Sequence, residues 1–418
     1  MKGRVYLCID LKSFYASVEC VARGLDPFRT NLVVADATRG QGSICLAITP
    51  AMKALGVRNR CRVYEIPKNI EYITAMPQMR KYMQVSAQVY SVYLRYISEE
   101  DIHVYSVDEC FLDVTDYLRL YGKKPREMAQ LLMDEVFRET GICATAGIGT
   151  NLFLAKVALD ILAKHAPDHI GFLDEDTFKE EIWYHRPVTD IWNVGGGTAR
   201  RLERMGVYDL HGITLLDEKL LFREFGVNAR YLIDHAHGVE PCTIADIRNH
   251  EVSEHSISHS QILFEDYSFD DTFIILREMV DLKVLELREK HLVAGGIGLS
   301  IGYSDDALKP SGASRKLECY TASFKKLMSC FEELYGECTS RNIPIRRVSI
   351  SFNLLRGEEE ETVNLFTDKE AAEKEKKLQR AMLDVRNRYG RNAILKGTSY
   401  REKATGRARN KMVGGHNG

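Results

Sequence analysis

Two adjacent carboxylates, Asp108 and Glu109, stand in the middle of "YSVDECFLDV", a run that otherwise predicts a β-strand. A solvent-facing turn would favour Gly or Asn at this point, and a buried strand would favour another Val. Paired negative charge on an apolar hairpin is costly unless a positive group binds it, and a divalent cation is the partner we expect. A cation site would need further ligands from the rest of the chain.

A third carboxylate, Asp10, ends the strand-like run "RVYLCID". The ends of neighbouring strands in an α/β sheet can meet although they are remote in sequence, so Asp10 could join Asp108 and Glu109. Three carboxylates at one point repel each other, and two Mg²⁺ ions about 3.5–4 Å apart would relieve this and support phosphoryl transfer. Spacing alone leaves an equal alternative, in which Asp10 caps the next helix and the acidic pair fills a polar bend.

The hydrophobic pattern divides the chain into several folded regions. Strand-like and helix-like runs alternate up to about residue 177 with one antiparallel hairpin, which predicts an α/β layer architecture. Short helices and Gly-rich turns follow over 186–240, and a second α+β module covers 255–356. The acidic run "RGEEEET" then predicts a linker. At 418 residues we expect two to four domains.

The charge is unevenly distributed. The formal net charge is only −2, but Lys and Arg far outnumber Asp and Glu over the last 48 residues, 371–418. A basic end favours a polyanion such as nucleic acid, although a solvated tail without a partner explains the charge nearly as well.

Cysteine spacing and hydropathy predict a cytoplasmic protein that does not enter a membrane. The ten cysteines form no CxxC pair and no zinc-binding spacing, so we interpret them as small buried residues of a reduced protein. The first residues, "MKGRVYLCIDLKS", contain charges and predict neither a signal peptide nor a membrane span.

Two lysines are candidates for binding phosphate. Lys156 follows "AGIGTN" on a predicted helix, and Lys53 lies on the short helix predicted for "TPAMKALGV". Each lysine alone is more often a surface residue that covers apolar neighbours. Together they could hold a triphosphate as point charges, without the bidentate geometry of arginine.

The segment "VGGGTARRLERMGV" is a candidate for binding a nucleic-acid backbone. Gly195 and Gly197 allow a tight turn that leaves backbone N–H groups free at a helix start, where a phosphate is favoured. Arg200 and Arg201 add positive charge. A generic Gly-rich turn is the alternative, but the following "RRLERMGV" makes this a candidate helix-hairpin-helix, which binds the backbone without reading bases.

Four motifs together resemble one family. "CIDLKSFYASVE", "SVDECFLDV", "AGIGTNLFLAK" and "VGGGTARRL" occur in the order and at the intervals of the Y-family, lesion-bypass DNA polymerases. "DLKSFYASVEC" and the tail "ATGRARNKMVGGH" are most similar to the bacterial UmuC-type branch. The resemblance implies a right-hand polymerase: palm (1–25 and 78–177), fingers (26–77), helical thumb with the helix-hairpin-helix (178–242), little finger (255–356), and a C-terminal segment of acidic linker, clamp-motif-like stretch and basic tail (357–418).

The resemblance also implies a metal site. Asp10, Asp108 and Glu109 would bind two Mg²⁺ ions, with the backbone carbonyl of Leu11 as a further ligand. Lys12 stands where many members of the family have another acid, so a fourth carboxylate is missing.

A nucleotide site is implied beside the metals. Phe14 would line the sugar pocket, Tyr15 would be the steric gate against ribonucleotides, and Lys156 would contact the triphosphate. Pro50 replaces a tyrosine that often touches the triphosphate, and Lys53 replaces an arginine, so we expect weaker or differently arranged triphosphate binding. The residues implied to contact DNA are Gly195, Gly197, Thr198 and Arg200.

The stretch "TVNLF", residues 362–366, resembles the short motif by which bacterial polymerases bind the sliding clamp. Its binding residues would be Val363, Leu365 and Phe366. It lacks the leading Gln of the pattern, and an ordinary linker is the alternative. Its place after the last strand and an acidic linker favours the motif, because such peptides must be extended and reachable.

These features predict a template-directed, error-prone translesion DNA polymerase, active in DNA repair and the SOS response to DNA damage. Its partners would be primer-template DNA, deoxynucleoside triphosphates and a sliding clamp. The rivals are a two-metal nuclease or nucleotidyl cyclase on a palm-like fold, and a non-catalytic DNA- or clamp-binding scaffold. A nuclease does not explain Phe14 and Tyr15, and a cyclase does not explain the helix-hairpin-helix. The three intact carboxylates argue against the scaffold, although Pro50 leaves it open.

Overall fold

The computed structural model describes residues 3–250, 256–305, 307–362 and 368–417. It divides into an N-terminal unit (Met1–His250 with His416–Gly418) and a C-terminal unit (Glu251–Gly415), which we describe separately. Within the described ranges no helix combines the length and the apolar character that crossing a membrane requires.

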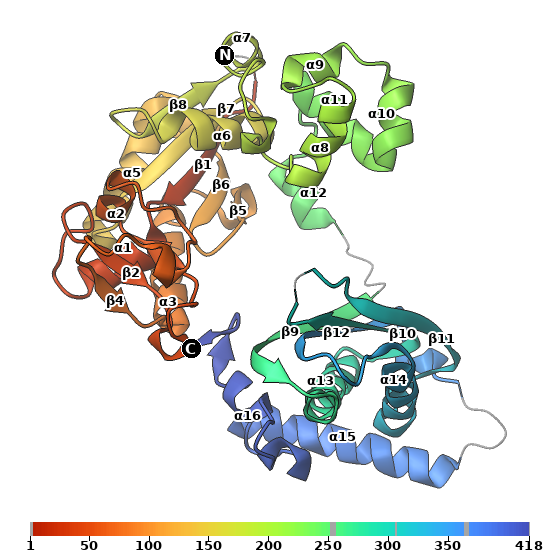
Figure 1. Cartoon of the computed structure of the whole chain (residues 1–418). Helices are drawn as coiled ribbons and strands as arrows, with labels where there is room; N and C mark the ends of the chain where they lie inside the picture. The colour runs from red at the N-terminus through yellow and green to blue at the C-terminus, as the bar shows by residue number, and fades with distance from the viewer. Residues whose placement is uncertain (1–2, 251–255, 306, 363–367, 418) are drawn as a thin grey trace. The chain divides into compact units, whose positions relative to one another are not determined.

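A five-stranded sheet forms the region predicted as the palm (Figure 1). β1 is the central strand and pairs antiparallel with β6 and β7, whereas β7 and β8 are parallel. The helices α3 (Met79–Tyr93) and α5 (Pro125–Thr140) contact each other, and α5 contacts β7. The strands in sheet order are β5 (Ile102–Val104), β6 (Glu109–Asp113), β1 (Tyr6–Leu11), β7 (Ala144–Gly149) and β8 (Ile170–Leu173).

The helix α6 (Leu152–Val157) lies unusually close to β7. A Cβ added at Gly147 would stand 2.0 Å from the backbone oxygen of Ala155, and one added at Gly149 would stand 2.1 Å from its nitrogen. Asn151 caps α6 as predicted, because its side chain accepts a hydrogen bond from the Leu154 N–H. A π-helical turn, η4 (Ala158–Ala163), continues α6. The two glycines thus set how deeply this helix lies on the sheet.

A smaller three-stranded sheet forms the region predicted as the fingers, in the order β3 (Ala47–Ile48), β2 (Leu32–Val34), β4 (Ile73–Ala75). The predicted short helix is present as α2 (Pro50–Ala54): Thr49 caps it by accepting from the Met52 N–H, and Pro50 occupies its first turn. In the sequence, α1 (Phe14–Val21) lies between β1 of the palm sheet and β2 of this sheet.

Short helices form the region predicted as the thumb, as the Gly-rich texture indicated. Their core includes Phe153 from α6, so the thumb packs against the same helix that lies on the palm sheet. The helices within the predicted bounds are α8 (Gly196–Arg204), α9 (Leu210–Thr214), α10 (Glu218–Phe225) and α11 (Ala229–Ala236). α7 (Glu175–Glu181) spans the predicted boundary with the palm, and α12 (Ile244–Asn249) follows the predicted thumb and contacts the palm strands β5 and β6.

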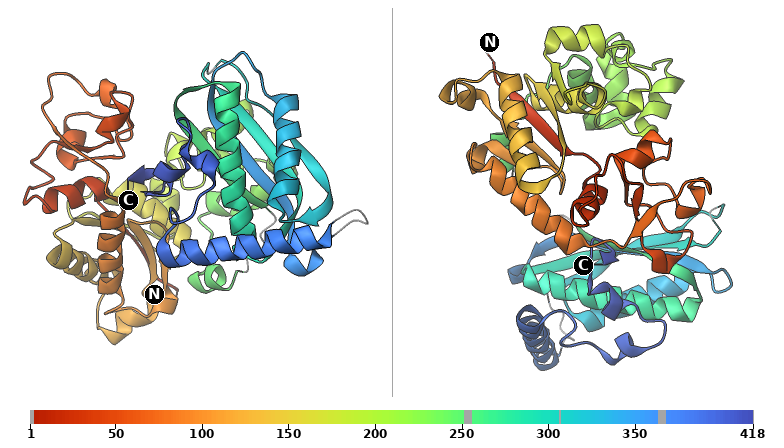
Figure 2. Two further views of the ribbon diagram at one scale, coloured as in Figure 1. Left: turned by 90° about the horizontal axis from the view of Figure 1, so that it is seen from below. Right: turned by 90° about the vertical axis from the view of Figure 1, so that its left-hand side faces the viewer.

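The C-terminal unit is a four-stranded antiparallel sheet with helices on one face (Figures 1 and 2). Apolar residues of α13 and α14 form one core with the sheet. In sheet order the strands are β11 (Ser311–Thr321), β10 (Leu292–Tyr303), β12 (Ile345–Gly357) and β9 (Ser256–Tyr267), and the helices are α13 (Phe269–Glu289) and α14 (Phe324–Cys338).

The segment predicted as acidic linker and basic tail contains regular structure. β12 runs to Gly357, a 3₁₀ turn covers Glu358–Glu360, and the long helix α15 (Lys369–Tyr389) contacts α13. Further along are η8 (Gly397–Tyr400), α16 (Gly406–Arg409), β13 (Met412–Val413) and β14 (His416–Asn417).

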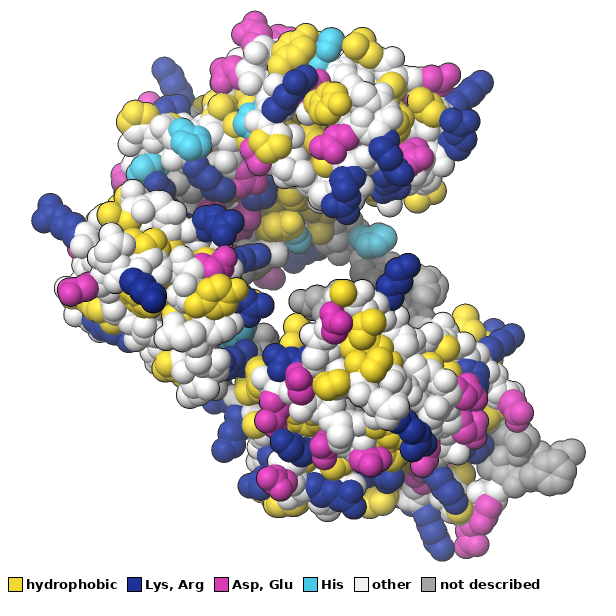
Figure 3. Space-filling view, viewed as in Figure 1, with side chains coloured by type: hydrophobic (Ala, Val, Ile, Leu, Met, Phe, Trp, Pro, Cys, Tyr) yellow, Lys and Arg dark blue, Asp and Glu magenta, His cyan; other side chains and the backbone are white. Residues whose placement is uncertain are grey.

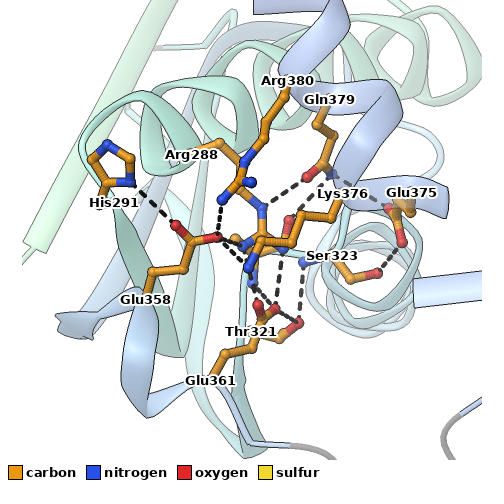
Figure 4. Close-up of polar contacts among 11 residues, drawn as sticks. Arg288, His291, Thr321, Ser323, Glu358, Glu361, Glu375, Lys376, Gln379 and Arg380 are labelled. Atoms are coloured by element: carbon orange, nitrogen blue, oxygen red, sulfur yellow. Dashed lines mark hydrogen bonds and ion pairs between the residues drawn. The ribbon is translucent and has the colours of Figure 1, made fainter. Parts of the chain in front are cut away.

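A buried arginine joins these C-terminal elements. Arg288 on α13 is 6% exposed and bonds to Glu358 at 3.0 Å, to Glu361 at 3.1 Å and to the side-chain oxygen of Gln379 on α15 at 2.9 Å (Figure 4). Lys376 of α15 adds a 2.6 Å ion pair to Glu358. Acidic residues of the segment predicted as a linker therefore attach α15 to the four-stranded sheet and its helices.

Candidate active site

The three predicted carboxylates come together at the end of the palm sheet. Asp10 on β1 lies directly opposite Glu109 on β6 in the antiparallel register. The Leu11 N–H donates to the backbone oxygen of Asp108 at 2.9 Å, which fixes the next pair of residues side by side. The register of two neighbouring strands thus sets the position of all three acids.

This arrangement crowds negative charge. Burial and the charges of Asp108 and Glu109 together raise the pKa of Asp10 to about 7, against the lowering effect of Lys164 and Lys156. Oxygen ligands of this kind suit a hard divalent cation, which would remove the repulsion. Among the described residues no three His, Cys, Asp or Glu side chains already stand in metal-binding geometry, so binding requires the carboxylates to rotate toward a common point.

Lys156 contacts the carboxylates directly. Its ammonium lies 2.7 Å from Glu109 and 2.8 Å from Asp160, and the side chain is 10% exposed. Burial alone would lower the pKa of Lys156, but the charges of Glu109 and Asp160 raise it, so the lysine stays charged. Asp160, which lies in the π-helical turn and also pairs with Lys164 at 2.9 Å, was not predicted. The four-residue spacing from Lys156 to Asp160 to Lys164 is the signal that could have indicated it.

The other lysines considered from the sequence lie on the same side of the palm. Lys53 is exposed on α2, near enough for its charge to interact with that of Asp10. Lys12, which replaces the family's fourth acid, lies 3.1 Å from the ring Nδ1 of His169. Positive side chains therefore approach the carboxylates from both the palm and the fingers.

The two aromatic residues after β1 lie at the start of α1. Ser13 adopts a left-handed conformation (φ 49°), which turns the chain from the strand into the helix. Phe14 is buried, whereas Tyr15 is half-buried. Burial raises the pKa of Tyr15, and the charge of Asp108 raises it further.

The Gly-rich turn in the thumb is open to solvent. α8 begins at Gly196, and a Cβ added at Gly195 or Gly197 would meet nothing within 4 Å. Arg200 is exposed beside them and Thr198 is half-buried. Arg201 differs from expectation, because it donates to the Glu224 carbonyl and lies 4.4 Å from the Phe225 ring centroid, as a structural residue would. Figure 3 shows Lys and Arg side chains along the surface of this helical region.

The predicted clamp-binding residues Val363, Leu365 and Phe366 lie outside the described residues. Thr362, the residue just before them, pairs with Tyr320 on β11. Its N–H donates to the Tyr320 carbonyl at 3.0 Å, and its hydroxyl accepts from the Tyr320 N–H at 2.8 Å.

Comparison with known proteins identifies related chains over both units. Residues 9–160 match the model of the impB/mucB/samB family, and residues 254–365 match the model of that family's C-terminal domain. "Putative UV-damage repair protein UvrX" of Bacillus subtilis (strain 168) is 32% identical over 98% of this chain and 97% of its own length. "DNA polymerase IV 2" of the same organism is 29% identical over 100% of this chain and 99% of its own length.

A solved structure has the same fold. The "Y-family DNA polymerase chimera Dbh-Dpo4(243-245)-Dbh" matches with a TM-score of 0.63 and 21% identity, and the match covers 84% of this chain and 98% of that one. The predicted right-hand architecture is confirmed, and the similarity to UvrX is compatible with the UmuC-type branch. The chain therefore belongs to the impB/mucB/samB family and has the fold of a Y-family DNA polymerase.

Proposed function

We propose that the protein is a template-directed, error-prone DNA polymerase that adds deoxynucleotides to a primer 3′ end opposite damaged template. The observation that carries this is the register that places Asp10 opposite Glu109 with Asp108 beside them. Relatives that match almost the whole chain are named for DNA polymerase IV and for the repair of UV damage, which supports the same activity. A cytoplasmic location fits an enzyme that copies bacterial DNA, and stays a prediction.

A divalent metal is part of this chemistry, and we propose two Mg²⁺ ions. Asp10, Asp108, Glu109 and the carbonyl of Leu11 would hold them. When bound, such ions supply the Lewis acidity that activates the primer hydroxyl and stabilises the leaving pyrophosphate. Lys156 would exchange one of its carboxylate partners for the incoming triphosphate.

The remaining site residues bind and orient the substrates. Lys53 approaches the carboxylates from the fingers and would add a second point charge on the triphosphate. Phe14 and Tyr15 would contact the sugar. In the thumb, exposed N–H groups and side chains would hold the DNA backbone: Gly195, Gly197, Thr198 and Arg200.

Primer extension by the full chain tests this proposal. With Mg²⁺ and single deoxynucleoside triphosphates, we expect the labelled primer to lengthen by one nucleotide chosen by the template, also opposite a damaged base. Shortening of the primer would indicate a nuclease. Binding of primer-template without any change in primer length would indicate a scaffold.

Tyr15 tests the nucleotide site, because we expect Tyr15→Ala to admit ribonucleotides. The ring would collide with a 2′ hydroxyl and tolerate a 2′ hydrogen, so its removal should raise ribonucleotide kcat/KM while deoxynucleotide use falls much less. If the ring only packs in the core, the variant should instead lose about 2–4 kcal/mol of stability and use all nucleotides equally less well. Tyr15→Phe, which keeps the ring, is the matched control, and an unchanged ribonucleotide-to-deoxynucleotide ratio in Tyr15→Ala would remove Tyr15 from the site.

The clamp motif gives a separate prediction. Apolar side chains usually dominate peptide docking, so the double variant Leu365→Ala, Phe366→Ala should lose most binding to a cognate sliding clamp in surface plasmon resonance. Extension of short primers without clamp should not change. Leu354→Ala, which truncates an exposed leucine on β12, is the control and should bind normally. Normal clamp binding by the double variant would leave "TVNLF" as a linker.

The described residues on either side of this stretch are held within the C-terminal unit. Glu361 and Thr362 are held by Arg288 and Tyr320, and Asp368 caps α15 by accepting from the Glu370 and Ala371 N–H groups. Five residues thus connect two points that both belong to the C-terminal unit.

A further inference from the structure

The ring of Tyr15 lies on the ring of a second tyrosine, Tyr82. The two ring centroids are 4.5 Å apart and the planes differ by 17°. Tyr82 belongs to α3 and is 0% exposed, whereas Tyr15 is half-buried. Stacked aromatic pairs at this distance attract each other, so the buried ring fixes the position of the partly exposed one from beneath.

Tyr82 is itself held in place by a buried carboxylate. Its hydroxyl donates to Glu19 at 2.8 Å, and the Gln78 side-chain amide donates to the same oxygen at 2.9 Å. Arg23 pairs with the other oxygen of Glu19, whose side chain is 0% exposed. Burial and the hydrogen bond to Glu19 raise the pKa of Tyr82, so its hydroxyl remains a donor.

These residues form a closed arrangement between two helices. Tyr15 and Glu19 lie one turn apart on α1, and Tyr82 lies one turn beyond Gln78, the N-cap of α3. The stack of Tyr15 on Tyr82 joins α1 to α3, and the hydrogen bonds that Glu19 of α1 accepts join it to the first turns of α3. Neither tyrosine ring can shift along its helix without breaking a buried hydrogen bond or the stack.

We infer that Tyr82 is a positioning residue for sugar discrimination, which sets the height of the Tyr15 ring beneath the nucleotide. This rests on the proposed function. A pocket that only offers an apolar surface rejects an added hydroxyl weakly, because a small shift of its wall accommodates the extra atom. Rejection becomes strong when the wall cannot move. Tyr82 supplies that rigidity, since a ring fully enclosed by close-packed protein has no free space into which Tyr15 could retreat.

Replacing Tyr82 in the full chain tests the inference. In Tyr82→Met and Tyr82→Leu the flat support is lost, and we expect the preference for deoxynucleotides over ribonucleotides to fall about tenfold or more. The change should come mainly from a lower KM for ribonucleotides, with deoxynucleotide kcat/KM falling much less. Tyr82→Phe keeps the ring and should keep the preference within about twofold. Single-nucleotide incorporation with each substrate gives these ratios.

Two controls separate positioning from general weakening. Leu132→Ala truncates a fully buried residue of α5, which packs against α3, and should lower thermal stability without changing the ratio. In a Tyr15→Ala background, Tyr82→Met should leave the ratio unchanged, because a residue that acts through Tyr15 has nothing left to position.

The inference is overturned if Tyr82→Met, which removes the flat ring but keeps a long, adaptable apolar side chain, retains the parental ratio, or if Leu132→Ala changes the ratio as much. It is also overturned if the effects of Tyr15→Ala and Tyr82→Met simply add. Failure of the proposed function has a different signature: the parent protein itself would extend no primer.

Discussion

Asp108→Asn should abolish primer extension, with kcat reduced by at least about 10²–10³-fold. The substitution keeps the shape of the side chain and removes its charge. A loss of activity would therefore show that the reaction needs the negative charge of Asp108 and not only its shape. The same result is expected for Asp10→Asn and Glu109→Gln, because the strand register places the three residues side by side. Single-turnover extension measures the chemical step, and fluorescence anisotropy should show nearly unchanged affinity for primer-template.

Asp116→Asn provides the control for this prediction. Asp116 is an exposed acid on α4 (Thr115–Leu120) of the same unit, so its substitution changes the net charge equally but should leave extension intact. Near-normal extension by Asp108→Asn would show that the carboxylates are not the catalytic ligands.

Arg288→Ala should cost the C-terminal unit about 3–5 kcal/mol, because removing the buried guanidinium leaves the partly buried carboxylates of Glu358 and Glu361 without this positive partner. Arg288 bonds to Glu358, Glu361 and Gln379 from α13, so α15 should lose its attachment as well. Native-state hydrogen exchange resolves this effect, and amides of α15 should lose protection together with those at the end of β12.

Arg315→Ala is the matched control in the same unit. Arg315 also contacts two acids, Glu333 and Glu337, but both carboxylates are 61% exposed, so the expected loss is at most about 1 kcal/mol. Equal losses for the two variants would contradict a special role for the buried network.

The network should also respond to acid. Burial would raise the pKa of Glu358, but hydrogen bonds from Lys376 and His291 and the charges of Lys376 and Arg288 lower it to about 2, below its ordinary value of 4.5. A lowered carboxyl pKa stabilises the folded state above about pH 4.5, and this stabilisation disappears as the pH falls toward 2. Hydrogen exchange between pH 5 and about pH 3 should therefore show α15 loosening before the sheet.

The sequence predicted that the three carboxylates lie close together because their signal is local. Acidic residues interrupt strand-like runs at Asp10 and Asp108, and strand ends meet in sheets. The partner of Lys156 was missed although its four-residue spacing is visible in "NLFLAKVALDILAKHA", because an acid at that spacing on a helix usually pairs with a lysine at the surface and does not by itself indicate a site. Tyr82 was missed because its role depends on a ring from another helix, and no spacing along the chain records that contact.

The attachment of the C-terminal segment was missed for a different reason. The described buried residues of α15 are Gln379, Met382 and Arg386, so the helix binds mostly through polar groups. Hydrophobic periodicity, the main sequence signal for a packed helix, is therefore weak there. Charged residues that suggest a solvated tail instead pair with Glu358 and Asp281, and the uncharged Gln379 accepts a hydrogen bond from Arg288.

The close approach of α6 to β7 has a genetic consequence. At Gly147 and Gly149 one added methyl group would overlap the backbone of Ala155, next to Lys156, so the helix would have to leave the sheet. Neither glycine has a side chain that could take part in the chemistry, yet alleles encoding alanine at either codon should be as null as an allele that lacks Asp10. A genetic selection for loss of damage-induced mutagenesis should therefore yield missense alleles in these two codons. A deep mutational scan should find alanine at either glycine as poorly tolerated as substitutions of Asp10.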